Sequence, residues 1–532
     1  MPQPADFIIE NARVWTGDPE QPAAEAVAVR GRRIAYVGTT ADARGWRGPA
    51  TRLIDGQNGT VTPGFIDSHL HLLYGSLNLS RAQLYGLRSR AAVITALKEF
   101  AVAHPDVPWV QGRGAAYDVI QGRADLDAAV SDRPVLVIAY DGHTGWANTR
   151  ALELAGILRD GEVRGPNSVI VRDAGGLATG ELRETGAISL VEDLIAEPSQ
   201  SEKRRWLVEG VRALNRSGVT AVHNMNGDLK ELELYREAER DGELTLRVYV
   251  PFHVEPHTAF EALPEAAEMA RTDGLARGGA VKFFMDGVLE SWTALMVAPY
   301  ADLPDSCGDA LFSLEHFVRM AGEADRMGLQ IAVHCCGDGA VRRTLDGYER
   351  IQSQNGPRER RRHRIEHIEV VHPDDLPRFR QLGVIGSVQP LHAPMPGDGD
   401  VWMGRAGRGR WGLSFAWRTL QQAGVRLALG SDWPVADFNP LAGIAAALTR
   451  QPWQPGDPEQ ALTLEELLVG YTRDAAYTEL REHERGRLRI GYLADLVLLD
   501  GDLARTAVED PAAVARLQPA LTVVDGSIAH AA

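Results

Sequence analysis

The sequence predicts an α/β fold built on a parallel (β/α)8 TIM barrel. The middle of the chain repeats an amphipathic helix, a glycine and a short apolar strand, which is typical of a parallel sheet covered by helices. Eight such strands follow one another, the number found in this barrel. Polar residues end many of these strands, which suits a site at one barrel mouth. We therefore favour the barrel over a doubly wound open sheet. The Gly-rich phosphate loop expected of that open sheet is absent from the sequence.

The eight predicted strands alternate with the repeated helices. A glycine just after a helix tolerates the left-handed conformation that ends it, and Gly218, Gly328, Gly383 and Gly424 each occupy this place before a strand. In chain order, the predicted strands comprise residues 61–71, 219–223, 246–252, 280–287, 329–334, 363–369, 384–388 and 425–431.

The two ends of the chain and one long interruption lie outside this repeat. Short alternating strands occur near both termini, too few at either end for an independent domain. We therefore expect residues 1–60 together with 485–532 to form one composite β-sandwich, and residues 61–484 to form the barrel. Residues from about 75 to 195 separate the first two barrel strands, and we expect an inserted subdomain there, over the barrel mouth.

Composition and charge exclude several classes of partner. The 532 residues are 44% hydrophobic and 24% charged, and their formal net charge is −16. This negative charge disfavours nucleic-acid and membrane partners, because both present anionic surfaces. No apolar run approaches the roughly 20 residues of a membrane span. The N-terminus lacks a signal-peptide pattern, and three cysteines, two of them adjacent, exclude a disulfide framework. The sequence thus predicts a soluble cytoplasmic protein.

Histidines and one carboxylate at strand ends form a candidate metal site. His69 and His71 are two residues apart at the end of the first strand, so both imidazoles project to the same side. His334, His367 and Asp432 each close a later strand, and in a barrel these ends face one pocket. Imidazole and carboxylate are ligands that a divalent ion such as zinc selects. The alternative is that His334 and His367 are ordinary core histidines.

Lys282 stands out because the chain has only four lysines and it lies in an apolar strand, VKFFMDG. A buried ammonium is costly and cannot ligate a metal. Burial lowers the pKa of lysine, and the neutral amine can take up CO2 as a carbamate with two anionic oxygens, which arginine cannot do. The alternative is an ion pair between Lys282 and Asp286 on the same face of the strand.

Longer motifs accompany the candidate metal ligands, which follow one another as His69, His71, Lys282, His334, His367 and Asp432. The motifs are PGFIDSHLHL, YDGHTGWANTRAL, VKFFMDG, RIEHIE, SVQPLH, GSDWPV and GYLADLVLLD. In these motifs the chain resembles the amidohydrolase superfamily with a binuclear metal centre. Within it, the chain is similar to the YtcJ-like (amidohydrolase-3) branch, which includes N-substituted formamide deformylases. The resemblance covers nearly the whole chain. It implies a distorted barrel, a composite β-sandwich from both termini and an insertion after strand one.

The resemblance also implies a metal centre and a reaction. Two divalent ions, zinc in our prediction, would be bridged by a hydroxide and by carbamylated Lys282. The other implied ligands are His69, His71 and Asp432 for the more buried ion, and His334 and His367 for the second. Such ions acidify the bridging water and polarise a carbonyl, while Asp432 would pass the proton of the hydroxide to the leaving nitrogen. We predict a hydrolase of a non-peptide C–N bond (amide, formamide or cyclic amide) in a small molecule, and the family suggests a homodimer.

Two other functions compete with this one. The first is deamination with a single metal ion on the same fold. Deaminases of this superfamily typically carry a glutamate three residues past the histidine of strand five, where this chain has Gly337. The second is a catalytically inactive scaffold, which would be expected to lack metal ligands, whereas all six are present here.

Six further residues are candidate substrate contacts. His143, Trp146 and Asn148 belong to the expected insertion, in the segment DGHTGWAN. Tyr117, Trp292 and His392 are the other candidates. For each of them, ordinary packing or a capped loop is the competing interpretation.

Overall fold

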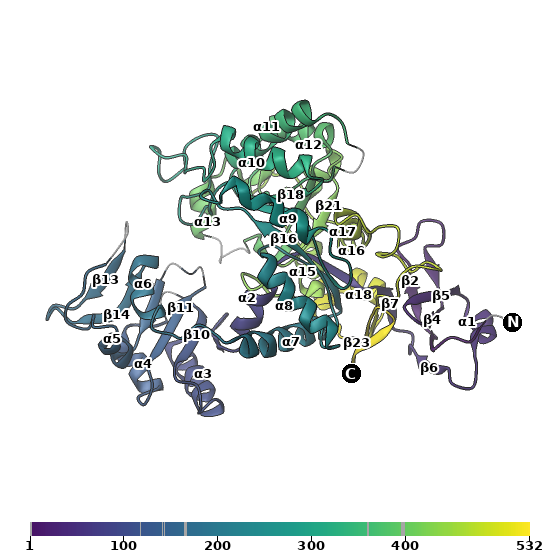
Figure 1. Cartoon of the computed structure of the whole chain (residues 1–532), viewed down its shortest axis with the longest axis horizontal. Helices are drawn as coiled ribbons and strands as arrows, with labels where there is room; N and C mark the ends of the chain where they lie inside the picture. The colour runs from purple at the N-terminus through teal and green to yellow at the C-terminus, as the bar shows by residue number, and fades with distance from the viewer. Residues whose placement is uncertain are drawn as a thin grey trace. The chain divides into compact units, whose positions relative to one another are not determined.

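The computed structural model describes residues 3–116, 119–140, 142, 144–163, 168–358, 361–394 and 400–532. The chain divides into two compact units, one comprising residues 1–72 with 211–532 and the other residues 73–210. Figure 1 traces their elements along the chain.

An eight-stranded sheet in the larger unit confirms the predicted barrel. Its strands pair in the order β21-β20-β19-β18-β17-β16-β15-β8, and every neighbouring pair is parallel. Backbone hydrogen bonds just beyond β21 nearly close the ring, because the Asp432 amide donates to the His69 carbonyl at 2.6 Å and the His71 amide donates to the Trp433 carbonyl at 2.8 Å. The strands are β8 (Phe65–Leu70), β15 (Val219–Asn224), β16 (Arg247–His253), β17 (Ala276–Phe284), β18 (Gln330–Cys335), β19 (Arg364–His367), β20 (Ile385–Val388) and β21 (Leu427–Leu429).

Helices follow the barrel strands, as the repeated pattern predicted. β15, β18 and β20 are buried along their whole length, as expected for strands covered on both faces. Within the described residues, no helix is long and apolar enough to cross a membrane. The main helices are α7 (Gln200–Arg216), α8 (Leu229–Arg240), α9 (Leu263–Met269), α10 (Leu314–Arg326), α11 (Asp338–Asn355), α12 (Leu376–Leu382), α13 (Asp400–Ala406), α14 (Trp417–Gln422), α15 (Pro440–Leu448), α16 (Leu464–Gly470) and α17 (Arg473–Thr478).

Two smaller sheets of the larger unit combine strands from both ends of the chain. Phe7, Val27, Val61, Leu496 and Val523 share one buried apolar cluster, so neither terminus has this core alone. The first sheet comprises β5 (Arg33–Gly38), β4 (Ala26–Arg30), β1 (Phe7–Glu10) and β6 (Arg52–Asp55). The second comprises β24 (Ser527–Ala531), β23 (Pro519–Val524), β22 (Leu496–Leu499), β7 (Thr60–Pro63), β2 (Arg13–Trp15) and β3 (Ala23–Ala24).

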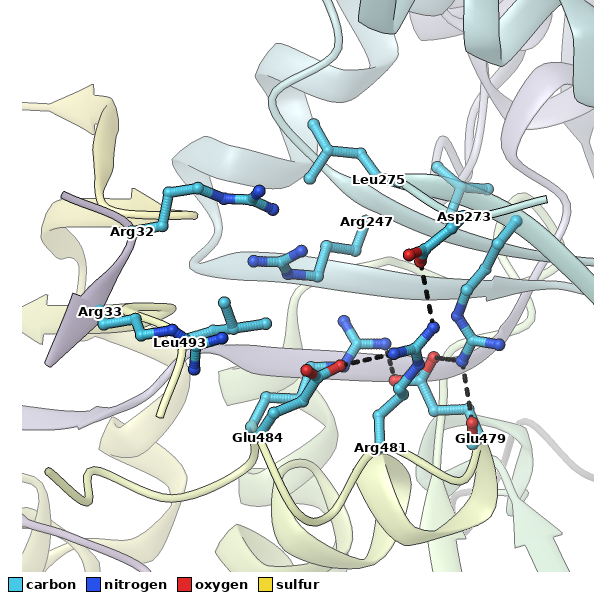
Figure 2. Close-up of a pocket in the computed structure, with 13 residues that line it drawn as sticks. Arg32, Arg33, Arg247, Asp273, Leu275, Glu479, Arg481, Glu484 and Leu493 are labelled. Atoms are coloured by element: carbon cyan, nitrogen blue, oxygen red, sulfur yellow. Dashed lines mark hydrogen bonds and ion pairs between the residues drawn. The ribbon is translucent and has the colours of Figure 1, made fainter. Parts of the chain in front are cut away.

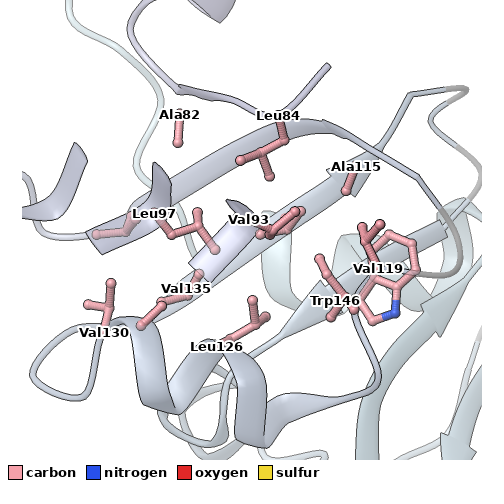
Figure 3. Close-up of a cluster of buried hydrophobic side chains, with 14 of the residues drawn as sticks. Ala82, Leu84, Val93, Leu97, Ala115, Val119, Leu126, Val130, Val135 and Trp146 are labelled. Carbon is pink, nitrogen blue, oxygen red and sulfur yellow. The ribbon is translucent and has the colours of Figure 1, made fainter. Parts of the chain in front are cut away.

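The smaller unit contains a sheet of its own with helices on both faces. Side chains of β11 (Val135–Ala139) alternate between two apolar clusters: Val135 and Val137 pack in one, and Leu136 and Ile138 in the other. Figure 3 shows the first cluster, where Trp146 lies beside Val119. The remaining strands are β13 (Val169–Arg172), β14 (Ala178–Arg183), β12 (Thr144–Ala147), β10 (Val110–Ala115) and β9 (Ala82–Gln83). The helices are α3 (Arg90–Ala103), α4 (Arg123–Ala129), α5 (Thr149–Leu154) and α6 (Thr185–Glu192).

Candidate metal centre

Three predicted ligands meet where the first and last barrel strands end. The Nε2 atoms of His69 and His71 lie 3.4 and 3.1 Å from Oδ1 of Asp432. One ligand atom from each of these three residues lies within 4.8 Å of the others, a spacing that suits a shared cation. The hydrogen bonds that join β8 to the segment after β21 bring these residues together although they are far apart in sequence.

His334 and His367 lie beside this group, at the ends of β18 and β19. Their ring centroids are 4.4 Å apart, and the ring of His367 is 4.7 Å from that of His69. Nε2 of His334 lies 3.0 Å from the carbonyl oxygen of Gly287. A carbonyl only accepts, so Nε2 of His334 carries the proton and its Nδ1 holds the free lone pair.

His392 joins the cluster from the turn after β20. Its ring stacks on that of His367, with centroids 5.8 Å apart and planes inclined by 7°. Its Nε2 lies 3.7 Å from Oδ2 of Asp432. His367, His392 and Asp432 therefore form a second group whose ligand atoms lie within 4.8 Å of one another.

Side-chain acceptors fix the orientation of three of these imidazoles. Nδ1 of His69 lies 2.6 Å from Glu366, a carboxylate that Arg364 also contacts through two nitrogens. Glu366 accepts, so Nδ1 of His69 carries the proton and Nε2 turns its lone pair toward Asp432. Burial alone would raise the pKa of Glu366, but the charge of Arg364 and the hydrogen bond from His69 lower it. Such partners orient the ligands of metal sites.

Two amide side chains orient the other imidazoles in the same way. Nδ1 of His71 lies 2.7 Å from Oδ1 of Asn226, and Nδ1 of His367 lies 2.9 Å from Oε1 of Gln389. Each amide oxygen accepts, which leaves Nε2 of both histidines available as a ligand.

Burial keeps the histidines neutral and therefore able to ligate. Loss of solvent lowers the pKa of His69 to about 4 and that of His334 to about 3, and it lowers the pKa of His367 well below 6.5. Burial would raise the pKa of Asp432, but the adjacent imidazoles of His69 and His71 lower it well below 3.8. At neutral pH the cluster thus presents lone pairs and a carboxylate, the protonation states that a metal requires.

The amine of Lys282 lies in the same buried cluster. Lys282 is 0% exposed, its Nζ lies 4.1 Å from the ring centroid of Phe284, and among the described residues it has no hydrogen-bond partner. Burial lowers its pKa to about 8, and its charge in turn lowers the pKa of His69 and His334. Asp286 instead accepts the backbone amides of Leu295, Cys336 and Gly337. The alternative of a Lys282–Asp286 ion pair is therefore wrong.

The residues present fit a divalent metal. In the described residues, Nε2 of His69 and Nζ of Lys282 are both buried polar atoms without a hydrogen-bond partner, and such atoms cost about 1–3 kcal/mol each. A cation would satisfy the imidazole directly, and it would satisfy the amine after conversion to a carbamate. Imidazole, carboxylate and carbamate oxygens are the donors that zinc accepts.

The backbone at two of the predicted ligands is strained. His367 and Asp432 have φ of 71° and 60°, and Ile368, which is β-branched, has φ of 52°. Side chains with a Cβ rarely adopt this left-handed conformation, and such strain gathers at functional sites.

Comparison with known proteins identifies the family. The sequence profile of the amidohydrolase family matches residues 52–530. The chain belongs to the amidohydrolase family. It is 30% identical to YtcJ of Bacillus subtilis (strain 168) over 91% of both chains. It is 29% identical to N-substituted formamide deformylase of Arthrobacter pascens, over 100% of this chain and 99% of that one. The resemblance read from the motifs is thereby confirmed.

A solved structure supports the same conclusion. An uncharacterized metal-dependent hydrolase from Pyrococcus furiosus superposes with a TM-score of 0.73 at 27% identity, covering 92% of this chain and 98% of that one. As a member of the amidohydrolase family, this chain is a hydrolase that acts on carbon–nitrogen bonds other than peptide bonds.

Two predicted substrate contacts have structural roles in this amidohydrolase. Asn148 is 0% exposed and uses both ends of its amide: Oδ1 accepts from the amides of Val135 and Ala151, and Nδ2 donates to two carbonyls. It caps α5 and has no polar group left for a substrate. Trp146 is 2% exposed within the apolar cluster of Figure 3. The expectation of substrate contact is corrected for both residues, because each is enclosed by its own unit.

Of the other four predicted substrate contacts, the structure describes two. Tyr117 and His143 lie outside the described residues. Trp292 lies in the loop after β17, where its Nε1 donates to Asp302 at 3.1 Å and the guanidinium of Arg405 lies 3.4 Å from the ring centroid. Of the six candidates, His392 is thus the one that the described structure brings to the ligand cluster.

Glu366 and Arg364 are site residues that the sequence analysis missed. Both lie in the fully buried strand β19, and the signal was available, because a buried charge requires a partner. Arg364 also donates to Nδ1 of His223 at 2.9 Å. Since arginine only donates, Nδ1 of His223 accepts and its proton is on Nε2. His223, for which the strand pattern gave no role, therefore supports the arginine behind the metal centre.

We expect Glu366→Gln to weaken metal binding by about 10–100-fold, because partners that orient a ligand carry effects of that size. The neutral amide also leaves Arg364 buried without its carboxylate, so the unfolding temperature should fall as well. Competition with a zinc-binding dye, on protein kept well below that temperature, measures the affinity. Glu349→Gln, at a residue whose side chain is 68% exposed, is the matched control. Equal affinity in both variants would contradict the role of Glu366.

Proposed function

We propose that this chain is a binuclear metal-dependent amidohydrolase that cleaves a non-peptide amide, formamide or cyclic amide bond. Two divalent ions, zinc in the proposal, would share one cluster of buried ligands. The ligands are His69, His71 and Asp432 for one ion, His334 and His367 for the other, and carbamylated Lys282 for both. The observation that carries the proposal is the meeting of His69, His71 and Asp432 beside the buried amine of Lys282, which has no hydrogen-bond partner among the described residues.

The protein's own groups would direct the reaction. When bound, the divalent ions would acidify water and polarise the scissile carbonyl. Asp432, a carboxylate at neutral pH, would accept the proton of the attacking water and return it to the leaving nitrogen. His392 faces the second carboxylate oxygen of Asp432 and would contact the substrate beside it. Glu366 and Asn226 would hold His69 and His71 in place throughout.

Metal content tests this proposal. We expect about two equivalents of metal per chain by mass spectrometry of the purified protein. His71→Asn should lose at least one of them, because it removes a ligand nitrogen 3.1 Å from Asp432. His257→Asn, at a side chain that is 83% exposed, should retain both. One equivalent in the wild type would favour the mononuclear deaminase, and none would favour the inactive scaffold.

The substrate class is tested by a screen of the zinc-loaded protein against N-formyl, N-acyl and cyclic amides. The similarity to N-substituted formamide deformylase motivates the N-formyl group. Release of ammonia from amino-purines or amino-pyrimidines, with no turnover of amides, would overturn the proposal in favour of deamination.

The surroundings of Gly337 disfavour deamination. Gly337 begins the segment that leads into α11, and its amide donates to Asp286 at 2.9 Å. A Cβ at this residue would collide with the backbone carbonyl oxygen of Leu295. The glutamate that deaminases typically carry here cannot be accommodated unless the backbone shifts, so the fold around the site suits the hydrolase.

A further inference from the structure

A cavity of about 320 Å³ lies in the larger unit, at the opposite end of the barrel from the metal centre. Arg247 and Arg277 line it from the first residues of β16 and β17, whereas the candidate metal ligands lie at or near the carboxyl ends of strands. Figure 2 shows Arg32 and Arg33 on one side, Arg481 with Asp273 on the other, and Arg247 between them. The lining arginines are Arg32, Arg33, Arg247, Arg277, Arg481 and Arg485.

The deepest part of this arginine cavity has more cations than anions. Arg277 and Arg485 both pair with the same carboxylate, Glu479, which is 1% exposed. Arg485 is itself 5% exposed, and its Nη1 has no hydrogen-bond partner within the part of the chain that the structure describes. Two guanidiniums that share one buried carboxylate leave one positive charge without a counter-ion, which is costly inside a protein.

The outer part of the cavity does not supply the missing negative charge. Arg247 pairs with Asp495 and Asp525, and Arg32 pairs with Asp525 as well. Arg481 pairs with Glu484 and Asp273.

Arg33 has a carbonyl oxygen for a partner, that of Gly491 at 2.5 Å. Ion pairs among the described side chains thus join the other five lining arginines to five carboxylates: Asp273, Glu479, Glu484, Asp495 and Asp525. A sixth carboxylate beside the cavity, Glu239, instead accepts the backbone amides of Leu275 and Ala276. Burial and the neighbouring arginines lower the pKa of Arg277 to about 10 and that of Arg485 well below 12.5, as expected where positive charge is in excess. The chain as a whole has a net charge of −16, so this local excess is not a consequence of composition.

We propose that the arginine cavity binds a phosphate-type oxyanion, alone or as the phosphate group of a small metabolite. Planar guanidiniums bind such groups with two hydrogen bonds each. Guanidiniums approach the cavity from several directions, which suits the four oxygens of a tetrahedral anion better than the two of a planar carboxylate. A volume of about 320 Å³ admits a phosphate together with a small organic group. The site is independent of the proposed hydrolase activity.

Calorimetric titration with inorganic phosphate tests the site. Metal-free protein is used because phosphate also binds metal ions. We expect saturable binding of one phosphate, weakened about tenfold in Arg33→Gln and in Arg481→Gln, since each removes one charge-assisted contact. Arg33 is exposed and the Arg481 side chain is 33% exposed, so both variants should fold. Arg505→Gln, at an exposed residue paired with Glu509 in α18 (Leu503–Glu509), should bind like the wild type.

Three outcomes would overturn the proposal. The first is no phosphate binding by the wild type at millimolar concentration. The second is equal binding by the wild type and both cavity variants, which would place the anion elsewhere. The third is tighter binding of succinate than of phosphate, which would make the ligand a carboxylate. A phosphate-dependent rise in the unfolding temperature, present in the wild type and reduced in Arg33→Gln and Arg481→Gln, is the independent second measurement.

Discussion

Asp432→Asn is expected to lower kcat by at least about a thousandfold while most of the metal stays bound. Asparagine retains the shape of the side chain and one oxygen able to ligate, but it cannot accept a proton. General acid–base catalysis contributes about 10²–10⁴-fold, and in this reaction one group would serve both as base and as acid. The pKa of Asp432 lies well below 3.8, so the wild-type residue is an ionised carboxylate at neutral pH and has a free site for a proton.

The measurement is kcat together with metal content, on the best substrate from the amide screen. Asp305→Asn is the matched control, because Asp305 is an exposed residue in the loop after β17. The control should retain the kcat and the metal content of the wild type. If the loss of activity in Asp432→Asn merely followed a loss of metal, Asp432 would be a ligand without a role in proton transfer.

The barrel could be predicted because its strands are almost entirely apolar and recur at similar intervals. On such strands a polar residue at the end is conspicuous, so His334, His367 and Asp432 could be selected from sequence alone. The alternation of a strand placed His69 and His71 on one side, and their nitrogens do lie near the same oxygen of Asp432. Each of these inferences needs only local periodicity and the rule that barrel strand ends face one pocket.

The partners of these residues could not be predicted in the same way. Glu366 meets His69 across the barrel interior, at a separation of 297 residues, and the contact depends on the register of strands between them. For Trp146 and Asn148, the sequence predicted substrate contacts that the structure does not support. Trp146 packs in the core of the smaller unit and Asn148 caps a helix there. In a single sequence, a residue that packs in a core or caps a helix cannot be distinguished from one that binds substrate.

Lys282→Met is expected to abolish activity and yet stabilise the metal-free protein. Methionine cannot form a carbamate, so the two proposed ions would lose their shared ligand and we expect kcat to fall at least about a thousandfold. In the wild type, however, the buried amine has a pKa of about 8 in place of its ordinary 10.5. That difference corresponds to a destabilisation of up to about 3 kcal/mol. Methionine fills the same space without this penalty.

The pH dependence of this stabilisation identifies its cause. The pKa of Lys282 is lower in the folded than in the unfolded protein, so the native state is penalised in full below pH 8, and the penalty disappears as the pH rises toward 10.5. Lys282→Met should therefore raise the unfolding temperature of chelator-treated protein by a few degrees at pH 7 and by much less at pH 10. Lys98→Met, at an exposed residue of α3, should change neither stability nor activity.

The same lowered pKa explains why this lysine could serve the metal centre. At pH 7, a pKa of about 8 leaves about one tenth of the amine neutral, against roughly three parts in ten thousand for an ordinary lysine. The neutral amine is the form that reacts with CO2, so the burial that destabilises the metal-free protein would also prepare the proposed ligand. Two bound ions and undiminished turnover in Lys282→Met would refute the carbamate. An unchanged unfolding temperature at pH 7 would show that the amine carries no such penalty.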